Sequence, residues 1–148
     1  MPEIIYAAIR AIDESWSELH RFICPDVSQK VFCHHLTLGF GANVNPYHIS
    51  NIGKKAVIRT TRIIGSMNPF LLCIQVDENV HKFGCTNLFP HITISCGNDV
   101  EPIQSNDVIR RLYEGDNTIK SQKCELTLEG VVDLFVKTPD GKGKWYLE

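Results

Sequence analysis

The residues best suited to chemistry are two histidines that occur in the same short pattern. Residues 33–38 read Cys-His-His-Leu-Thr-Leu, and residues 90–94 read Pro-His-Ile-Thr-Ile. Each segment contains a histidine, an apolar residue, a threonine and a second apolar residue. Side chains two positions apart in a β-strand point to the same face. We therefore expect two strands that each present an imidazole and a hydroxyl on one face and bury apolar side chains on the other.

This arrangement suits the cleavage of a phosphodiester. In-line displacement at phosphorus needs a base that takes a proton from the attacking oxygen and an acid that protonates the leaving oxygen. Imidazole titrates near neutrality, so His35 and His91 can fill these two roles at physiological pH. The hydroxyls of Thr37 and Thr93 can donate hydrogen bonds to the non-bridging oxygens, where charge concentrates in the transition state. The pattern does not identify the acid. The alternative interpretation is that both strands expose a polar face carrying ordinary surface histidines.

The other histidines are expected to be structural or exposed. Alternation along the strand places His34 on the face opposite His35, which favours a partly buried structural role. His20 and His48 are expected on the surface of a helix and a loop, and His81 in an irregular surface segment. None of these four is predicted to react.

Two aromatic residues near the motifs are candidates for substrate binding. Tyr6 lies on the first predicted strand and Phe40 directly follows the first motif. Both can stack on nucleobases, since every base offers a π-face. Packing against the protein is the alternative role for each of them.

The cysteines and histidines do not form a recognisable metal site. Zinc sites combine such ligands at short spacings, but this sequence has no Cys-x₂-Cys or His-x₃-His pair. We expect no metal and no cofactor. Most of the six cysteines lie in apolar, strand-like segments, and the N-terminus does not resemble a signal peptide. Reduced thiols in a cytoplasmic protein are therefore the expectation.

The composition predicts one globular domain over residues 1–148. Apolar residues make up 43% of the chain and charged residues 22%, as in ordinary globular proteins. The net charge of −2 provides no general field for long duplex nucleic acid, but allows a small anionic ligand in a local pocket. No apolar segment is long enough to span a membrane. We expect a monomer that binds a small nucleotide or short oligonucleotide.

The predicted elements indicate an α+β fold with mainly antiparallel strands. Helical spacing is found after Asp13, up to Pro25, and again after Ser105 or Asn106, where either residue could cap a helix. A turn at 138–143 predicts a hairpin near the end of the chain. The predicted strands are Ile4–Ala11, 31–40, 55–64, Phe70–Val76, 90–96, 120–128, 131–136 and 144–147.

The twin motifs resemble those of the 2H (LigT-like) phosphoesterase superfamily. The resemblance rests on His35-Leu36-Thr37 and His91-Ile92-Thr93, each followed by an apolar residue, and extends to the order of elements over most of the chain. It implies a two-lobed, pseudo-symmetric fold in which antiparallel sheets surround a central cleft and each lobe contributes one motif. It also implies metal-independent hydrolysis or transesterification of ribose phosphodiesters that involve a 2′ oxygen.

Three functions remain open at this point. The first is a phosphodiesterase for small nucleotides, with cyclic dinucleotides or 2′-5′ oligoadenylates expected ahead of 2′,3′-cyclic phosphates at RNA ends. Very small members of the superfamily occur in viruses, where they resemble agents that counter host nucleotide signalling. The second is a catalytically silent nucleotide- or RNA-binding module, although two intact motifs argue against it. The third is a protein-interaction domain with accidental motifs.

Overall fold

A computed structural model describes residues 2–148, which form nine strands and a small number of short helices. The strands are β1 (Ile4–Ala11), β2 (Gln29–Val31), β3 (His35–Phe40), β4 (Lys55–Met67), β5 (Phe70–Val76), β6 (His91–Gly97), β7 (Lys120–Lys123), β8 (Thr127–Val136) and β9 (Lys144–Trp145). The helices are α1 (Pro46–Ser50), α2 (Gln104–Tyr113) and the 3-10 helices η1 (Glu14–Phe22), η2 (Gly41–Asn43) and η3 (Glu78–Phe83).

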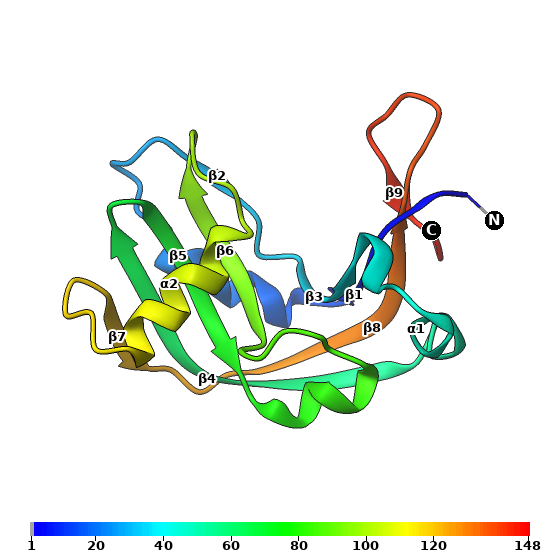
Figure 1. The fold of residues 1–148 in the computed structure, drawn as a ribbon, viewed down its shortest axis with the longest axis horizontal. Helices are drawn as coiled ribbons and strands as arrows, with labels where there is room; N and C mark the ends of the chain where they lie inside the picture. The colour runs from blue at the N-terminus through cyan, green and yellow to red at the C-terminus, as the bar shows by residue number, and fades with distance from the viewer. Residues whose placement is uncertain (1) are drawn as a thin grey trace.

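The strands form two antiparallel sheets that share the long strand β4. The first sheet has the order β4-β8-β1-β3, with β9 on β8. The second has the order β2-β6-β5-β4, with β7 on the other edge of β4. The first half of β4 pairs with β8, and the second half pairs with β5. Figure 1 shows β4 and β8 running lengthwise through the molecule, which gives the predicted two-lobed α+β architecture.

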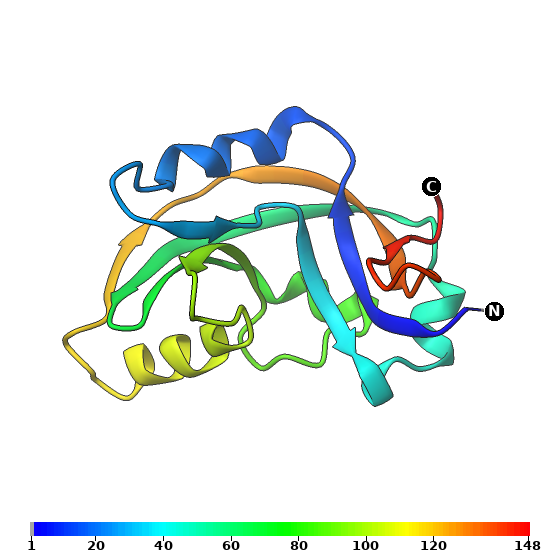
Figure 2. The ribbon, with the colours of Figure 1, turned by 90° about the horizontal axis from the view of Figure 1, so that it is seen from above.

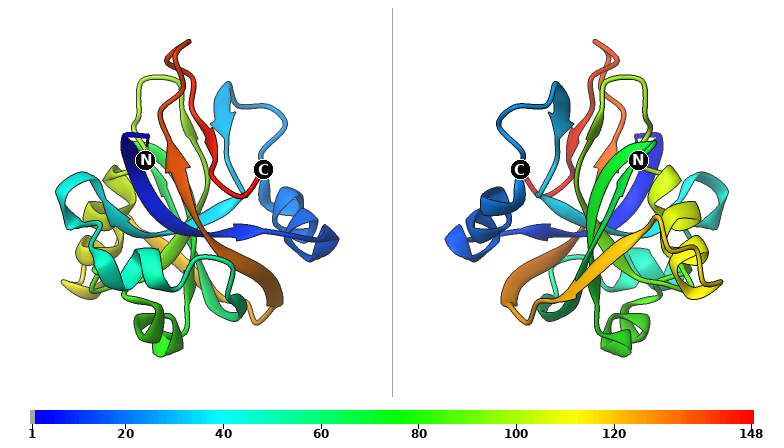
Figure 3. Two further views of the ribbon diagram at one scale, coloured as in Figure 1. Left: turned by 90° about the vertical axis from the view of Figure 1, so that its right-hand side faces the viewer. Right: turned by 90° about the vertical axis from the view of Figure 1, so that its left-hand side faces the viewer.

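Each sheet carries one His-x-Thr motif, on β3 in the first sheet and on β6 in the second. The helices η1 and α2 lie on opposite sides of the molecule (Figures 2 and 3). Helix η1 packs near β8, β1 and β6, whereas α2 packs on β4 and β5. The segment that connects β2 to β3 crosses from the second sheet to the first and brings the two motif strands together.

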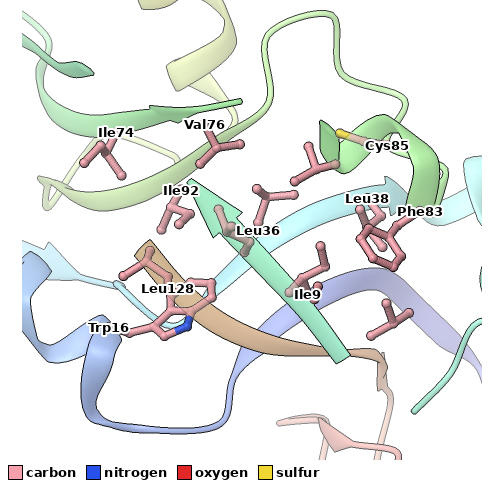
Figure 4. Close-up of a cluster of buried hydrophobic side chains, with 14 of the residues drawn as sticks. Ile9, Trp16, Leu36, Leu38, Ile74, Val76, Phe83, Cys85, Ile92 and Leu128 are labelled. Atoms are coloured by element: carbon pink, nitrogen blue, oxygen red, sulfur yellow. The ribbon is translucent and has the colours of Figure 1, made fainter. Parts of the chain in front are cut away.

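The backs of both motif strands lie in one hydrophobic core. Leu36 and Leu38 of β3, and Ile92 and Ile94 of β6, are fully buried in the same cluster. Figure 4 shows side chains from both strands converging beside Trp16 of η1. The predicted alternation is therefore confirmed for the apolar half of each motif, and the core fixes the two polar faces relative to each other.

Both motif strands also bulge at the same motif position. The pairing of β1 with β3 skips Leu38, since Ala7 faces Gly39 and Ala8 faces Thr37. The pairing of β5 with β6 skips Ile94 in the same way, between Ser95 and Thr93. Each skipped residue follows the motif threonine. A β-bulge bends and twists a strand and so re-aims its neighbouring side chains. The two lobes thus repeat a structural device as well as a sequence pattern.

One predicted strand is interrupted. The sequence suggested a strand over 31–40, but β2 ends at Val31 and β3 begins at His35. Between them Cys33 adopts a positive φ of 62°, in the left-handed region. Its N–H donates to the Thr93 carbonyl (3.1 Å), and the His34 carbonyl accepts from Ala11 N–H (3.0 Å). Residues 32–34 are therefore not part of a strand, although their sequence favours one, because the chain passes here from the second sheet to the first.

Both helices that the sequence predicts are present, but the first differs from prediction in type and the second in its start. Asp13 caps the first helix as expected, accepting a hydrogen bond from Ser15 N–H, although the helix is a 3-10 helix. Neither Ser105 nor Asn106 caps α2, which begins at Gln104 after Ile103 without a side-chain cap. Ser105 instead points into the interior and is fully buried. The remaining predicted strands and the hairpin at 138–143 are present, with shifted ends and with 120–128 divided between β7 and β8.

His48 was expected on the surface, but it is fully buried. Its Nδ1 accepts a hydrogen bond from Asn45 N–H (3.2 Å), so its Nε2–H donates to the Gly84 carbonyl (2.7 Å). Gly84 has φ 86°, and a Cβ there would lie 2.8 Å from the His48 ring. His48 thus clamps α1 to the end of η3, from which the chain leads to the second motif.

Replacing His48 by alanine should lower the free energy of unfolding by about 2–4 kcal/mol, because it empties a fully buried position and removes the hydrogen bonds to Asn45 N–H and to the Gly84 carbonyl. The control is His20→Ala on the exposed side of η1, expected to stay within about 0.5 kcal/mol of wild type. Urea denaturation measures both. Equal stabilities of the two variants would show that the clamp has no energetic role.

Candidate active site

A cavity of about 490 Å³ opens between the two motif strands. Its size is within the range of sites for small ligands. Both motif histidines and both motif threonines line it, as do residues of β1, of the loop before β6 and of the first turn of α2. The lining residues are Tyr6, Phe32, His34, His35, Thr37, Phe40, Asn87, His91, Thr93, Glu101, Pro102, Ile103 and Asn106. The structure therefore brings together all six residues predicted to form the site.

His91 is held in one tautomer by the backbone. The residue is 9% exposed, and its Nδ1 lies 2.8 Å from the Phe89 carbonyl. A carbonyl only accepts, so Nδ1 carries the proton and the neutral ring leaves Nε2 with a free lone pair. Burial lowers the pKa of His91, although the bond to Phe89 acts in the opposite direction. His91 is therefore a neutral imidazole that can accept a proton at Nε2.

His35 lies among other rings. It stacks on Tyr6 at a centroid distance of 4.8 Å and meets the edge of Trp145 at 5.9 Å. Burial lowers the pKa of His35 well below its usual value, and the charges that His34 and His91 would carry lower it further. A phosphate anion between the motif strands would act against these effects, because it favours an imidazolium. Both imidazoles line the same cavity, so a charge on one disfavours a charge on the other.

The prediction for His34 was wrong. It lines the cavity beside His35, with the two Nδ1 atoms 2.7 Å apart and the rings stacked at 4.6 Å. The left-handed turn at Cys33 breaks the alternation from which the opposite face was inferred. Only the doubled histidine in the sequence hinted at this arrangement.

The two motif threonines have different surroundings. Thr93 Oγ1 lies 3.1 Å from Ser105 Oγ, a buried hydroxyl on α2 that sequence reasoning treated as a helix cap. Thr37 lines the cavity from β3, next to the loop whose Thr86 N–H donates to the Leu38 carbonyl (2.8 Å). Thr93 thus has a partner that fixes its rotamer, while Thr37 is held through its strand.

Tyr6 and Phe40 both line the cavity, and they belong to a larger feature that we call the aromatic row. Its members are Phe40, Tyr6, Phe135 and Trp145, and each lies on a strand paired with that of the next. The ring centroids are 6.2 Å apart for Phe40 and Tyr6, 5.1 Å for Tyr6 and Phe135, and 5.1 Å for Phe135 and Trp145. Burial raises the pKa of the Tyr6 phenol, so it stays neutral. Phe40 is 59% exposed and offers the freest ring for stacking, whereas Tyr6 is already flanked by His35 and Phe135.

The cavity has little fixed charge. Among the described residues that line it, Glu101 is the only acidic one and none is lysine or arginine. Across residues 2–148 no group of three or more His, Cys, Asp or Glu side chains is placed to hold a metal ion. The donors around the cavity are instead imidazoles, hydroxyls and amides, which suits hydrogen bonding to a singly charged phosphodiester.

Comparison with known families agrees with this geometry. Residues 30–137 match the model of the fungal tRNA ligase phosphodiesterase domain, a stretch that includes both motifs and most of both sheets. This chain belongs to that family. It is accordingly a phosphodiesterase of the 2H phosphoesterase superfamily, as the twin motifs predicted.

A solved structure supports the fold. The chain is similar to a crystal structure of a fungal RNA kinase, with a TM-score of 0.62 and 17% sequence identity. The match covers 88% of this chain and 45% of the other, so the chain spans less than half of that protein's length. At this identity the likeness concerns the fold alone.

Comparison with curated protein sequences gives no match. Within residues 2–148, no helix is long and apolar enough to cross a membrane.

The depressed pKa of His91 should make the folded protein less stable in acid. Between the folded pKa and the unfolded value near 6.5 the unfolded chain binds more protons, so the free energy of unfolding falls as pH decreases below about 6.5. One such proton contributes up to about 1.4 kcal/mol per pH unit. His91→Asn keeps a donor for the Phe89 carbonyl but does not titrate. Urea denaturation measures the free energy of unfolding of both proteins between pH 7 and pH 5, and this free energy should fall less in the variant. An equal fall in the variant and the wild type would show that burial of His91 does not cause the loss of stability in acid.

Proposed function

We propose that the protein hydrolyses 2′,3′-cyclic phosphates at the ends of RNA, with His35 and His91 as the acid/base pair and Thr37 and Thr93 as hydrogen-bond donors to the phosphate. The observation that carries this proposal is the cavity lined by both motifs in a member of the tRNA ligase phosphodiesterase family. We further propose that residues 1–148 act as one unit, because β4 belongs to both sheets.

The chemistry follows from the placement of the two imidazoles. A water oxygen attacks phosphorus while one imidazole takes its proton. The bond from phosphorus to one ribose oxygen breaks, and the other imidazole protonates that oxygen. The threonine hydroxyls stabilise charge on the non-bridging oxygens. No step needs a metal, since each proton has a donor or acceptor within the motif pairs.

The low charge of the site also supports a cyclic phosphate. A cyclic phosphodiester carries one negative charge, whereas the monoester product carries about −1.5 to −2 near neutral pH. A cavity lined by neutral donors and Glu101 gives the product no fixed cation to bind. Release of the more highly charged product is therefore favoured.

Cyclic dinucleotides and 2′-5′ oligoadenylates, with a role in countering host nucleotide signalling, are the second candidate substrates. Two observations favour them: the net charge of −2 and the absence of Lys or Arg from the described lining, since both suit a small ligand better than long RNA.

In either case Phe40 is the residue proposed to stack on a base, with Tyr6 supporting it from β1. The buried thiols suit the reducing, cytoplasmic setting expected from the sequence.

A substrate panel tests the proposal. The protein is incubated with an RNA oligonucleotide ending in a 2′,3′-cyclic phosphate, with 2′,3′-cyclic AMP, with a 2′-5′ oligoadenylate and with a cyclic dinucleotide, and products are identified by mass. We expect the highest kcat/KM for the RNA end. Preference for the dinucleotide or the oligoadenylate would support the second candidate, and no turnover of any substrate would leave only a binding module.

Replacing either motif histidine by alanine should reduce turnover of the preferred substrate about 10²–10⁴-fold, the usual contribution of one acid or base. The double variant should lose much less than the product of the two effects, because the histidines act as a unit. Alanine at Thr37 or Thr93 should cost on the order of 10–10³-fold. Near-normal turnover by folded His35→Ala or His91→Ala protein would exclude the paired mechanism.

Hydrolysis should persist in excess EDTA, because protonation and charge stabilisation are assigned to side chains. The assay compares untreated protein, EDTA-treated protein and treated protein supplied again with Mg²⁺, Mn²⁺ or Zn²⁺. Rates should agree within about twofold. Loss of activity on chelation that a divalent ion restores would show that the site works with a metal after all.

A further inference from the structure

His34 and His35 share a single proton between their Nδ1 atoms. At 2.7 Å, two N–H groups would collide and two lone pairs would repel, so one ring donates and the other accepts. The pair therefore holds at most one positive charge and titrates as a unit. His35 lies among Tyr6, His34 and Trp145, whereas His34 is exposed on its outer side.

The contact is built into the fold. Cys33 is 4% exposed, its N–H donates to the Thr93 carbonyl, and its Sγ lies 3.5 Å from the Ile94 carbonyl. The His34 carbonyl accepts from Ala11 N–H. The backbone that carries His34 is thus bonded to both motif-bearing sheets, and the 2.7 Å contact joins two anchored positions.

The two motif histidines consequently differ in their support. The Phe89 carbonyl can only accept, so neutral His91 always offers a bare Nε2. The group beside His35 Nδ1 is instead the His34 imidazole, which can either donate or accept. When His34 is the Nε2–H tautomer, its Nδ1 accepts the His35 Nδ1–H. In that state an added proton can remain at His35 Nε2, facing the cavity, while the charged ring keeps its hydrogen bond to His34.

We propose that His34 is a positioning residue for His35: its Nδ1 accepts the His35 Nδ1–H, so that His35 becomes the imidazolium acid toward a bound phosphodiester and His91 the base. This inference rests on the proposed function. The water proton passes to His91 Nε2, a bond forms between the water oxygen and phosphorus, and the bond from phosphorus to the leaving ribose oxygen breaks. That oxygen receives the His35 Nε2 proton. His35 ends neutral and still bonded to His34, and exchange with solvent restores both rings.

Few other groups near the pair titrate. Tyr6 is a neutral phenol against His35, and Arg10, opposite His35 on β1, is bound to the buried Asp133 carboxylate (2.7 Å). Glu101 and His91 face it across the cavity. Of these groups only His91 is another imidazole, so any further imidazole titration beside the cavity can be assigned to the pair.

Three variants test the role of His34 by activity. His34→Phe keeps a ring but removes the acceptor, His34→Asn places an amide oxygen near the Nδ1 position, and His20→Phe is the control on η1. We expect kcat to fall about 10–100-fold in His34→Phe, the range for groups that orient a reacting side chain, with partial recovery in His34→Asn and no change in His20→Phe. Neutral His34 stabilises the His35 imidazolium by accepting its Nδ1–H. The alkaline limb of the pH profile, which reports the acid, should therefore move about one unit lower in His34→Phe, and the acidic limb should stay in place.

NMR of protein with ¹⁵N-labelled histidine supplies a readout independent of turnover. With saturating sulfate as the anion probe at pH 6, we expect His35 doubly protonated, His34 as the Nε2–H tautomer and His91 as the Nδ1–H tautomer. Sulfate shows no competing titration at this pH. The proposal would be overturned if the NMR spectra showed His35 unprotonated at Nδ1 or His34 positively charged. It would also be overturned if His34→Phe lowered kcat equally at every pH, without a shift of the alkaline limb. If His35→Ala or His91→Ala retains activity, the proposed function itself fails, whatever the tautomers of His34 and His35.

Discussion

The hydrophobic core behind the two motif strands is the constraint on which the site depends. Leu36 and Leu38 from one sheet and Ile92 and Ile94 from the other are all fully buried in the same cluster. Interiors pack as densely as organic crystals, so strands that share such a cluster cannot shift independently. The imidazoles on their opposite faces are consequently held at a set separation. Acid/base catalysis by a pair needs this kind of fixed geometry more than it needs strong binding.

Much of this could be predicted from the sequence because the relevant patterns are local. Alternation within each motif assigned His35, Thr37, His91 and Thr93 to cavity-facing positions, and the apolar residues between them to the core. The resemblance carried by the twin motifs also implied two lobes, and each of the two sheets carries one motif. These inferences hold because side chains alternate between the two faces of an unbroken strand, and each His-x-Thr triplet lies within one such stretch.

The missed features arise where tertiary structure overrides that period. His34 was placed on the wrong face because the chain crosses between sheets at Cys33, and no local pattern reports a crossing. His48 was predicted on the surface because the local sequence does not show what buries it. One of its two partners, Gly84, lies 36 residues away in the chain. Ser105 matched a helix cap in composition, yet the fold uses its hydroxyl beside Thr93. The bulges after both motif threonines depend on pairing with β1 and β5, so they too were invisible in the sequence.

The order in which the strands pair has a consequence for the synthesis of the chain. Strand β3, with the first motif, pairs with β1. On its other side β1 pairs with β8, from Ile4 with Val136 to Ala11 with Gly130, residues that lie about 120–130 positions apart. Strand β8 also pairs with β4, which the second sheet shares. Such non-local pairings form slowly, because a long loop must close before any contact compensates for the lost entropy. During translation, strand β1, which carries β3 on one edge, therefore lacks its partner on the other edge until β8 has emerged from the ribosome.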